Sequence, residues 1–188
     1  MSDPKARDER QSWRPAVLVL VASVLFGYLV LPYWSGGARS SSPLVGQVAP
    51  DFSLPVFHGG TGVASRVELS SLRGNVVVLD FWASWCRPCA VQSSILSEMV
   101  PNLADDVVFV GVNTADNPAR AREFAEREKL PYAAVLDSGE VAQAYGASSL
   151  PTLVVIDPSG RVVSAASRVM SASEVEKAIA QASAIPPG

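Results

Sequence analysis

The chain has few of the residues that metal sites and disulfide scaffolds require. Its 188 residues include two cysteines and one histidine, His58. Two cysteines cannot build a disulfide-rich fold, and one histidine is too few for a histidine-built metal centre. Basic and acidic residues nearly balance, 15 against 18, so the chain lacks the basic excess of a nucleic-acid binder. We therefore expect no nucleic acid as a partner.

What the chain does have is an uncharged apolar run near its N-terminus, VLVLVASVLFGYLVL at residues 17–31. Extended to residues 16–34, the run would span about 28 Å as a helix, close to the thickness of a bilayer core. Aromatic residues flank it as interfacial anchors would, and more basic residues precede it than follow it. These flanking residues are Trp13, Tyr33 and Trp34, with Lys5, Arg7, Arg10 and Arg14 before the run and Arg39 after it.

This pattern predicts a single-pass anchor at residues 16–34 in a bacterial inner membrane. The basic residues would keep segment 1–15 in the cytoplasm and place the remainder in the periplasm or outside. A cleaved signal peptide is the alternative, because Gly36 and Ala38 are small residues at an acceptable spacing for cleavage. The folded part would then be secreted or periplasmic.

Residues 35–44 are small and polar and predict a linker, which leaves residues 45–188 as one globular domain. Two apolar runs, 76–82 and 107–112, are typical of strands that are buried on both faces. Cap and turn residues predict the other elements. Helices are expected after Cys86 to about 100 and over 118–130, 140–145 and 173–182, and strands over 52–56, 66–68, 132–136, 152–156 and 161–165. The alternation predicts an α/β fold with a central mixed sheet flanked by helices.

Both cysteines lie in one short motif, FWASWCRPC, directly after the run at 76–82. As a zinc site the motif would supply two of four ligands, and no second pair exists. A structural disulfide would close a tiny loop and remove little unfolded-state entropy. A redox pair is therefore favoured. A copper-binding or copper-delivery module stays open as an alternative, although only His58 could add a further ligand.

The position of Cys86, between a strand and a helix, supplies the chemistry of a redox pair. Free N–H groups and the positive end of the helix dipole would stabilise its thiolate. Arg87 adds a cationic influence, and Pro88 suits the first turn of a helix. Cys89, one turn later, would point back and resolve a mixed disulfide. Cys86 is thus the expected nucleophile and Cys89 the expected resolving residue.

Two segments resemble thioredoxins: VVVLDFWASWCRPC at 76–89, and YGASSLPTLVVID at 145–157. The resemblance implies that Pro151 is a cis-proline beside the redox pair and that Leu150 offers main-chain groups to a bound peptide. It also implies that Asp80 is a buried aspartate that exchanges a proton with Cys89. Trp85 would flank the substrate groove, which Arg87 and Pro88 would also border.

The opening VGQVAPDFSLP and the extra helix and strand at 117–136 resemble a particular branch of that family. This is the anchored TlpA-like and ResA-like branch of thiol–disulfide oxidoreductases, which includes cytochrome c maturation thioredoxins. The likeness covers about residues 45–183 and implies a thioredoxin-like fold with an N-terminal extension and an inserted helix–strand. It implies no cofactor and no metal. The implied partners are exported proteins with disulfides, apocytochrome c among them, and a membrane-embedded thiol transporter as electron donor.

Two positions depart from that branch, which often has a glutamate and a proline where this chain has Gln92 and Ser94. Gln92 cannot ionise, so the sequence favours a general thioredoxin-like reductase over a dedicated apocytochrome reductase. The Arg-Pro dipeptide between the cysteines favours reduction, since strongly oxidising DsbA-type sites have a histidine there. A peroxiredoxin-type peroxidase is the other alternative class, although the motif lacks the PxxxTxxC pattern of such enzymes.

Overall fold

The computed structural model describes residues 17–21, 23–26, 43–59 and 65–185. The chain divides into two units, residues 1–40 and 41–188. In the first unit the described residues are helical. Among the described residues, no helix combines the length and the apolar character that a membrane crossing needs. The predicted segment 1–15, most of the predicted anchor at 16–34 and most of the predicted linker lie outside the described residues.

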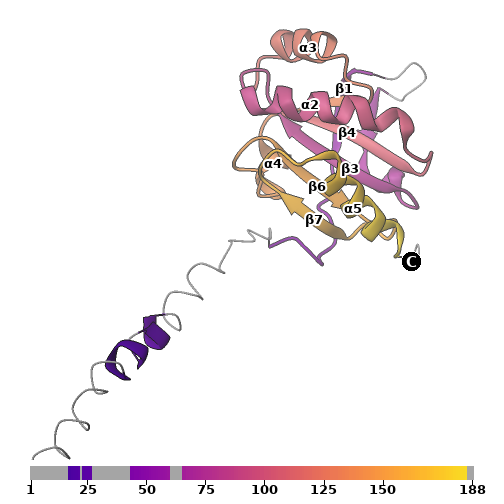
Figure 1. Ribbon diagram of the computed structural model, residues 1–188. Coiled ribbons are helices and arrows are strands. Elements are labelled where there is room, and N and C mark those ends of the chain that lie inside the picture. Colours follow the sequence, from indigo (N-terminus) through magenta and orange to yellow (C-terminus); the bar gives the residue numbers. More distant parts are fainter. Residues whose placement is uncertain (1–16, 22, 27–42, 60–64, 186–188) are drawn as a thin grey trace, which may run out of the picture. The chain divides into compact units, whose positions relative to one another are not determined.

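The second unit is built around one seven-stranded mixed sheet, with the order β2-β1-β5-β4-β3-β6-β7 (Figure 1). Three strands run parallel in its centre: β3 (Val76–Trp82), β4 (Val107–Thr114) and β5 (Ala133–Asp137). The antiparallel hairpin of β6 (Thr152–Ile156) and β7 (Val162–Ala166) extends the sheet from β3. The hairpin of β1 (Ser53–His58) and β2 (Arg66–Glu68) extends it from β5.

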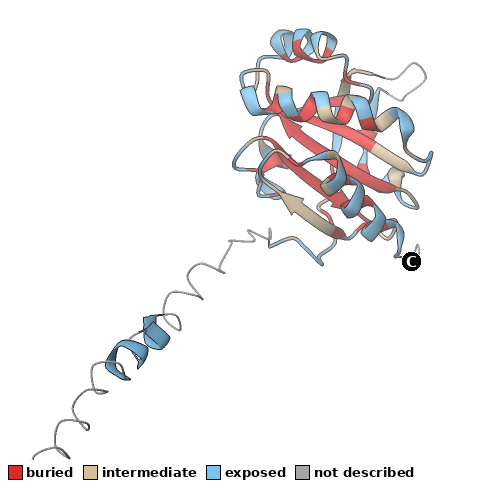
Figure 2. Cartoon of the chain, in the orientation of Figure 1, coloured by how far each residue is buried: buried red, intermediate tan, exposed pale blue. Residues whose placement is uncertain are grey.

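Strand β3 explains why the sheet needs cover on both sides. All seven of its residues are buried, and alternate side chains enter two separate apolar clusters. Val78 and Trp82 point to one face, and Leu79 and Phe81 to the other. The expectation of a strand buried on both faces is confirmed. Figure 2 shows the resulting buried layer between exposed helix surfaces.

Helices cover the two faces of the sheet. The first face, with Val78 and Trp82, packs against α2 (Arg87–Met99), α3 (Pro118–Arg127) and α5 (Ala172–Ser183). The other face packs against α4 (Glu140–Ala144) and the chain that leads into β1. Short 3-10 turns, η2 (Leu69–Leu72) and η3 (Val100–Asn102), follow β2 and α2. The predicted α/β fold with a mixed sheet is confirmed.

Several predicted boundaries move by a few residues. Helix α3 ends at Arg127 rather than near residue 130, because the chain turns at Lys129, whose φ is 52°. A positive φ is uncommon for a residue other than glycine, and no local signal in the sequence marks this turn. His58, the one histidine, is the half-buried last residue of β1. Its ring Nε2 lies 3.1 Å from the carbonyl oxygen of Leu130, which explains its burial.

Candidate active site

The two cysteines lie at the junction between β3 and α2. They form a disulfide with an S–S distance of 2.01 Å and a Cα–Cα distance of 5.3 Å. Cys86 is the N-cap residue of α2, and the backbone N–H of Cys89 donates a hydrogen bond to its sulfur at 3.2 Å. Pro88 lies in the first turn of the helix, where a missing N–H costs nothing. The predicted strand–cysteine–helix arrangement is confirmed.

The two cysteines differ slightly in exposure to solvent. In this oxidised form Cys86 is 5 % exposed and Cys89 is 1 % exposed. The residues on either side of Cys86, Trp85 and Arg87, are exposed. Cys86 is thus slightly more exposed than Cys89, and its role as the nucleophile stays a prediction.

The Leu150–Pro151 peptide bond is cis, as the resemblance implied. Strand β6 starts at Thr152, which pairs with Phe81 near the end of β3. Because the two strands are antiparallel, Pro151 lies at the end of the sheet where β3 passes into the cysteine motif. Leu150 packs against the cluster that contains both cysteines. The fold thus brings the predicted cis-proline segment and the cysteine motif together.

A cavity of about 580 Å³ opens beside the cysteine motif. The exposed indole of Trp85 forms one wall, and Leu150 belongs to another. None of the described residues that line the cavity is charged, and most of the lining side chains are small. These small residues include Thr114, Ala115, Ala147, Ser148 and Ser149. The cavity is therefore an uncharged space beside Trp85, the residue that precedes Cys86.

Asp116 holds the loop that carries the cysteine motif, a role that the sequence did not indicate. Its carboxylate accepts hydrogen bonds from the backbone N–H and the hydroxyl of Ser84, from the Asn113 side chain and from the Asn117 N–H. Burial raises the pKa of Asp116, but these hydrogen bonds outweigh it and bring the pKa below its usual value. Asp116 thus ties the segment before Cys86 to the end of β4.

Asp80 is buried beneath α2, as the resemblance implied. It is 1 % exposed and lies in β3 between Gly111 of β4 and Leu153 of β6. Burial raises the pKa of Asp80 to about 7, and the hydrogen bond that the Tyr132 hydroxyl donates to Oδ2 at 2.9 Å opposes the rise. Asp80 can therefore change its protonation state near neutral pH. Tyr132 could not be predicted as its partner, because the two residues are far apart in the chain.

Gln92 has a structural contact at the position where the resembling branch often has a glutamate. Its side chain is completely buried in α2, and its carbonyl oxygen accepts a hydrogen bond from the backbone N–H of Met170 at 2.7 Å. The contact ties α2 to the chain that leads into α5. Among the described residues, no group of three or more His, Cys, Asp and Glu side chains could hold a metal ion.

A cysteine pair at a helix N-cap, a cis-proline at the same end of the sheet and a buried aspartate beneath it define a thiol–disulfide oxidoreductase with a thioredoxin-like fold. The model of the AhpC/TSA family matches residues 45–165, and the chain belongs to this family.

Comparison with known proteins supports the same class. The chain is 30 % identical over 173 residues to the thiol–disulfide oxidoreductase ResA of Geobacillus thermodenitrificans, which covers 91 % of this chain and 95 % of the relative. It is 32 % identical over 148 residues to the thiol:disulfide interchange protein DsbE of Xylella fastidiosa. This alignment covers 78 % of this chain and 71 % of the relative. A secreted thiol–disulfide isomerase from Corynebacterium glutamicum has a similar structure, with a TM-score of 0.61 and 26 % identity. The match covers 71 % of this chain and 83 % of the isomerase.

Proposed function

We propose that the protein is an extracytoplasmic reductase that breaks disulfides of exported proteins through Cys86 and Cys89. The observation that carries this proposal is the place of Cys86 at the N-cap of α2, with the Cys89 N–H directed at its sulfur. In the reduced protein, this hydrogen bond and the positive end of the helix dipole would stabilise a thiolate on Cys86. The thiolate is the species that attacks disulfides.

In the first step the Cys86 thiolate attacks one sulfur of the client disulfide. The client S–S bond breaks, a mixed disulfide forms between Cys86 and the client, and the first client thiolate leaves and takes a proton from solvent. The greater exposure of Cys86 supports its assignment as the attacking residue. Trp85, Arg87 and Pro88 would border the client here, and the neighbouring cavity would receive one of its uncharged side chains.

In the second step Cys89 resolves the mixed disulfide. Its thiol gives its proton to the Asp80 carboxylate, and the new thiolate attacks the Cys86 sulfur. The Cys86–Cys89 disulfide forms, and the second client sulfur leaves as a thiolate and is protonated. Two electrons pass to the client, so the pair must afterwards be reduced by a dithiol donor. The pKa of Asp80, near 7, supports its role as proton acceptor.

The cis-proline segment would hold the client polypeptide during both steps. Leu150 directly precedes the cis bond and lines the cavity beside Trp85. Its main-chain groups would pair with an extended client segment, as the family resemblance implies, and Pro151 would fix their direction. This arrangement supports protein clients rather than small disulfides as substrates.

The proposed direction of electron transfer and the proposed location of the protein rest on the sequence. The Arg-Pro dipeptide supports a reducing site. A measured reduction potential near that of DsbA, about −120 mV, would contradict that direction. The basic residues before segment 16–34 support export of the domain, with an inner-membrane anchor and a membrane-embedded thiol transporter as donor. Apocytochrome c is one candidate among the exported clients.

The proposal is tested by trapping clients with the Cys89→Ser variant. Without the resolving thiol, mixed disulfides through Cys86 should accumulate and release identifiable proteins when a reductant is added. The matched control is Cys86→Ser, which should trap nothing and reduce no disulfide. Equal trapping by Cys86→Ser would contradict the assignment of the two residues. Tight stoichiometric copper binding without reductase activity would instead support a copper-delivery module.

A further inference from the structure

Asp80 differs from the other buried carboxylates of the described chain in how few hydrogen bonds it accepts. Asp137 accepts bonds from the Val141 and Ala142 N–H groups, and Asp157 accepts bonds from Ser159 and Arg161. Within the described residues, Asp80 accepts one, from the Tyr132 hydroxyl, and its Oδ1 has no partner. The Tyr132 hydroxyl is therefore the contact that orients this carboxyl.

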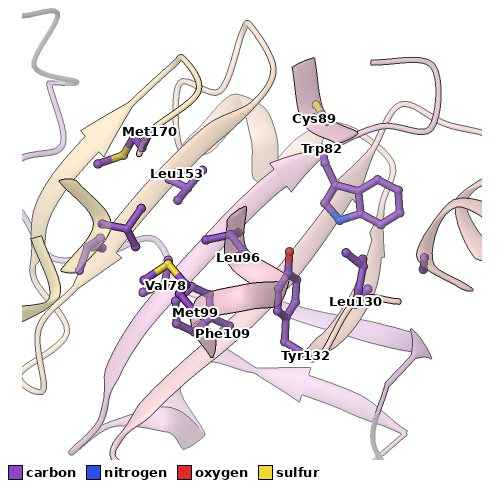
Figure 3. Packing of buried hydrophobic residues seen from close by; sticks show 14 of the residues in the cluster. Val78, Trp82, Cys89, Leu96, Met99, Phe109, Leu130, Tyr132, Leu153 and Met170 are labelled. Carbon is purple, nitrogen blue, oxygen red and sulfur yellow. The ribbon is translucent and has the colours of Figure 1, made fainter. Parts of the chain in front are cut away.

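Tyr132 is held firmly in the position from which it reaches Asp80. It directly precedes β5, is 5 % exposed and packs against the ring of Phe109 with a centroid distance of 5.8 Å. Figure 3 shows its hydroxyl pointing into the buried cluster, on the side where Trp82 and Cys89 lie. The orientation of the hydroxyl is thus fixed by packing and not by solvent.

Gly111, the β4 residue that pairs with Asp80 of β3, leaves room for the Tyr132 ring. Gly111 pairs in register with Asp80, and a Cβ atom there would lie 2.9 Å from the Trp82 Nε1 and 3.2 Å from the Tyr132 Cε2. Any larger residue at position 111 would push the tyrosine ring or the indole away. Glycine therefore permits the close approach of Tyr132 to the carboxyl.

Few other groups can influence the charge of Asp80. Among the described residues, the titratable side chain that contacts Asp80 is that of Tyr132, and the two cysteines belong to the buried cluster on the same face of the sheet. The neighbouring strands present Gly111 and Leu153. The charged residues of the covering helices point to solvent or are only partly buried: Arg87 and Glu98 on α2, Arg120, Arg122, Glu123, Glu126 and Arg127 on α3, and Glu174, Glu176 and Lys177 on α5.

We propose that Tyr132 is a positioning residue for the resolving step, which holds the Asp80 carboxyl in place and sets the pH at which it accepts the Cys89 proton. The inference rests on the proposed role of Asp80. A hydrogen bond donated to a carboxylate stabilises the charged form, so Tyr132 favours the proton-accepting state. Burial and the nearby Asp80 raise the pKa of Tyr132 well above its usual value, so the tyrosine keeps its own proton throughout.

The test uses Tyr132→Phe, which removes the hydroxyl and keeps the ring. The full-length reduced protein is mixed with 5,5′-dithiobis(2-nitrobenzoate), and release of the coloured thiolate is followed by stopped flow across pH. The first release reports attack by Cys86 and the second reports resolution by Cys89. In Tyr132→Phe the pH midpoint of the second release should rise by about one unit, while the first release stays unchanged.

The matched control is Tyr145→Phe, which removes a buried hydroxyl that donates to the Pro50 carbonyl on the opposite face of the sheet. Both of its phases should match those of the unchanged protein. A wild-type midpoint in Tyr132→Phe would overturn the inference. Asp80→Asn separates the two claims: an unchanged second phase there would remove Asp80 itself from the mechanism. In the Asp80→Asn background, Tyr132→Phe should cause no further shift, and a further shift would also overturn the inference.

Discussion

The backbone N–H of Cys89 donates a hydrogen bond to the sulfur of Cys86 at 3.2 Å. This contact exists because Cys86 occupies the N-cap of α2, where the first N–H groups of the helix have no backbone acceptor. In other helices a hydroxyl or carboxylate oxygen fills this place. Here a sulfur fills it, so the helix start that stabilises the fold also stabilises a thiolate once the disulfide is reduced.

The burial of Asp80 predicts a stability that depends on pH. The pKa of Asp80 is raised from 3.8 to about 7, so the folded state holds the proton more tightly than the unfolded state over that interval. The contribution of Asp80 is therefore greatest below pH 4 and is lost as pH rises towards 7. In Asp80→Asn this loss disappears. The oxidised variant should unfold with a free energy higher by about 4 kcal/mol at pH 8 and nearly equal at pH 4.

Urea unfolding of the oxidised protein at pH 4 and pH 8 measures this difference. Asp105→Asn is the control, because Asp105 is an exposed carboxylate on the turn before β4. Its stability should follow that of the unchanged protein at both values. Equal free energies of unfolding for Asp80→Asn and the unchanged protein at pH 8 would show that burial of the Asp80 carboxylate does not destabilise the fold at that pH.

Most elements of the fold follow from local signals in the sequence. The Asn117 side chain caps α3 by accepting bonds from the Ala119 and Arg120 N–H groups, and a capping box of Ser171 and Glu174 starts α5. The continuous apolar run of β3 predicted burial on both faces. The order of the strands in the sheet could not be predicted from these local signals. The placement of β5 between β4 and β1 depends on pairing between distant segments, which leaves no mark within either segment.

The candidate site divides in the same way. The redox pair was predicted from a local motif, and the cis bond before Pro151 and the burial of Asp80 were implied by the resemblance to thioredoxins. Tyr132 and Asp116 were missed because each acts on a residue of a different element through a side-chain contact. Such contacts are created when the strands align, so they can be seen only in three dimensions.

Asp116 leads to a second prediction, on the loop before the cysteines. Asp116→Asn replaces a carboxylate oxygen with an amide donor, so at least one of the bonds from Ser84, Asn113 and Asn117 is lost. We expect the free energy of unfolding at pH 7 to fall by about 1 kcal/mol and attack by Cys86 to slow.

The lowered pKa of Asp116 gives the sign of its pH dependence. Its stabilising effect is present above the usual aspartate pKa, near 4, and is lost as pH falls below that value. Unfolding of Asp116→Asn and the unchanged protein should therefore differ more at pH 7 than at pH 3. A difference of the same size at both values would contradict the role of the charged carboxylate.

Trp85 leads to a third prediction, on client binding. Its side chain is 63 % exposed and forms a wall of the cavity, with Nε1 3.4 Å from the Ala115 carbonyl oxygen. Exposed tryptophans that bury against a partner often supply much of the binding energy, about 2 kcal/mol or more. Trp85→Ala should therefore lower kcat/KM for a protein disulfide by roughly thirtyfold, with little change in stability.

Val91→Ala is the matched control, because Val91 is an exposed apolar residue of α2 that does not line the cavity. Its kcat/KM should stay close to that of the unchanged protein. Reduction of a small disulfide that cannot fill the cavity should be much less sensitive to Trp85→Ala. An equal loss on both substrates would indicate damage to the cysteine motif itself.

The central claim, that the start of α2 makes Cys86 a reactive thiolate, is tested most directly by the pH dependence of its alkylation. In reduced Cys89→Ser, Cys86 is the only cysteine, so the rate of iodoacetamide labelling reports its thiolate alone. We predict that the midpoint of this rate lies clearly below the about 8.5 of an unperturbed cysteine. A midpoint at or above that value would contradict the account.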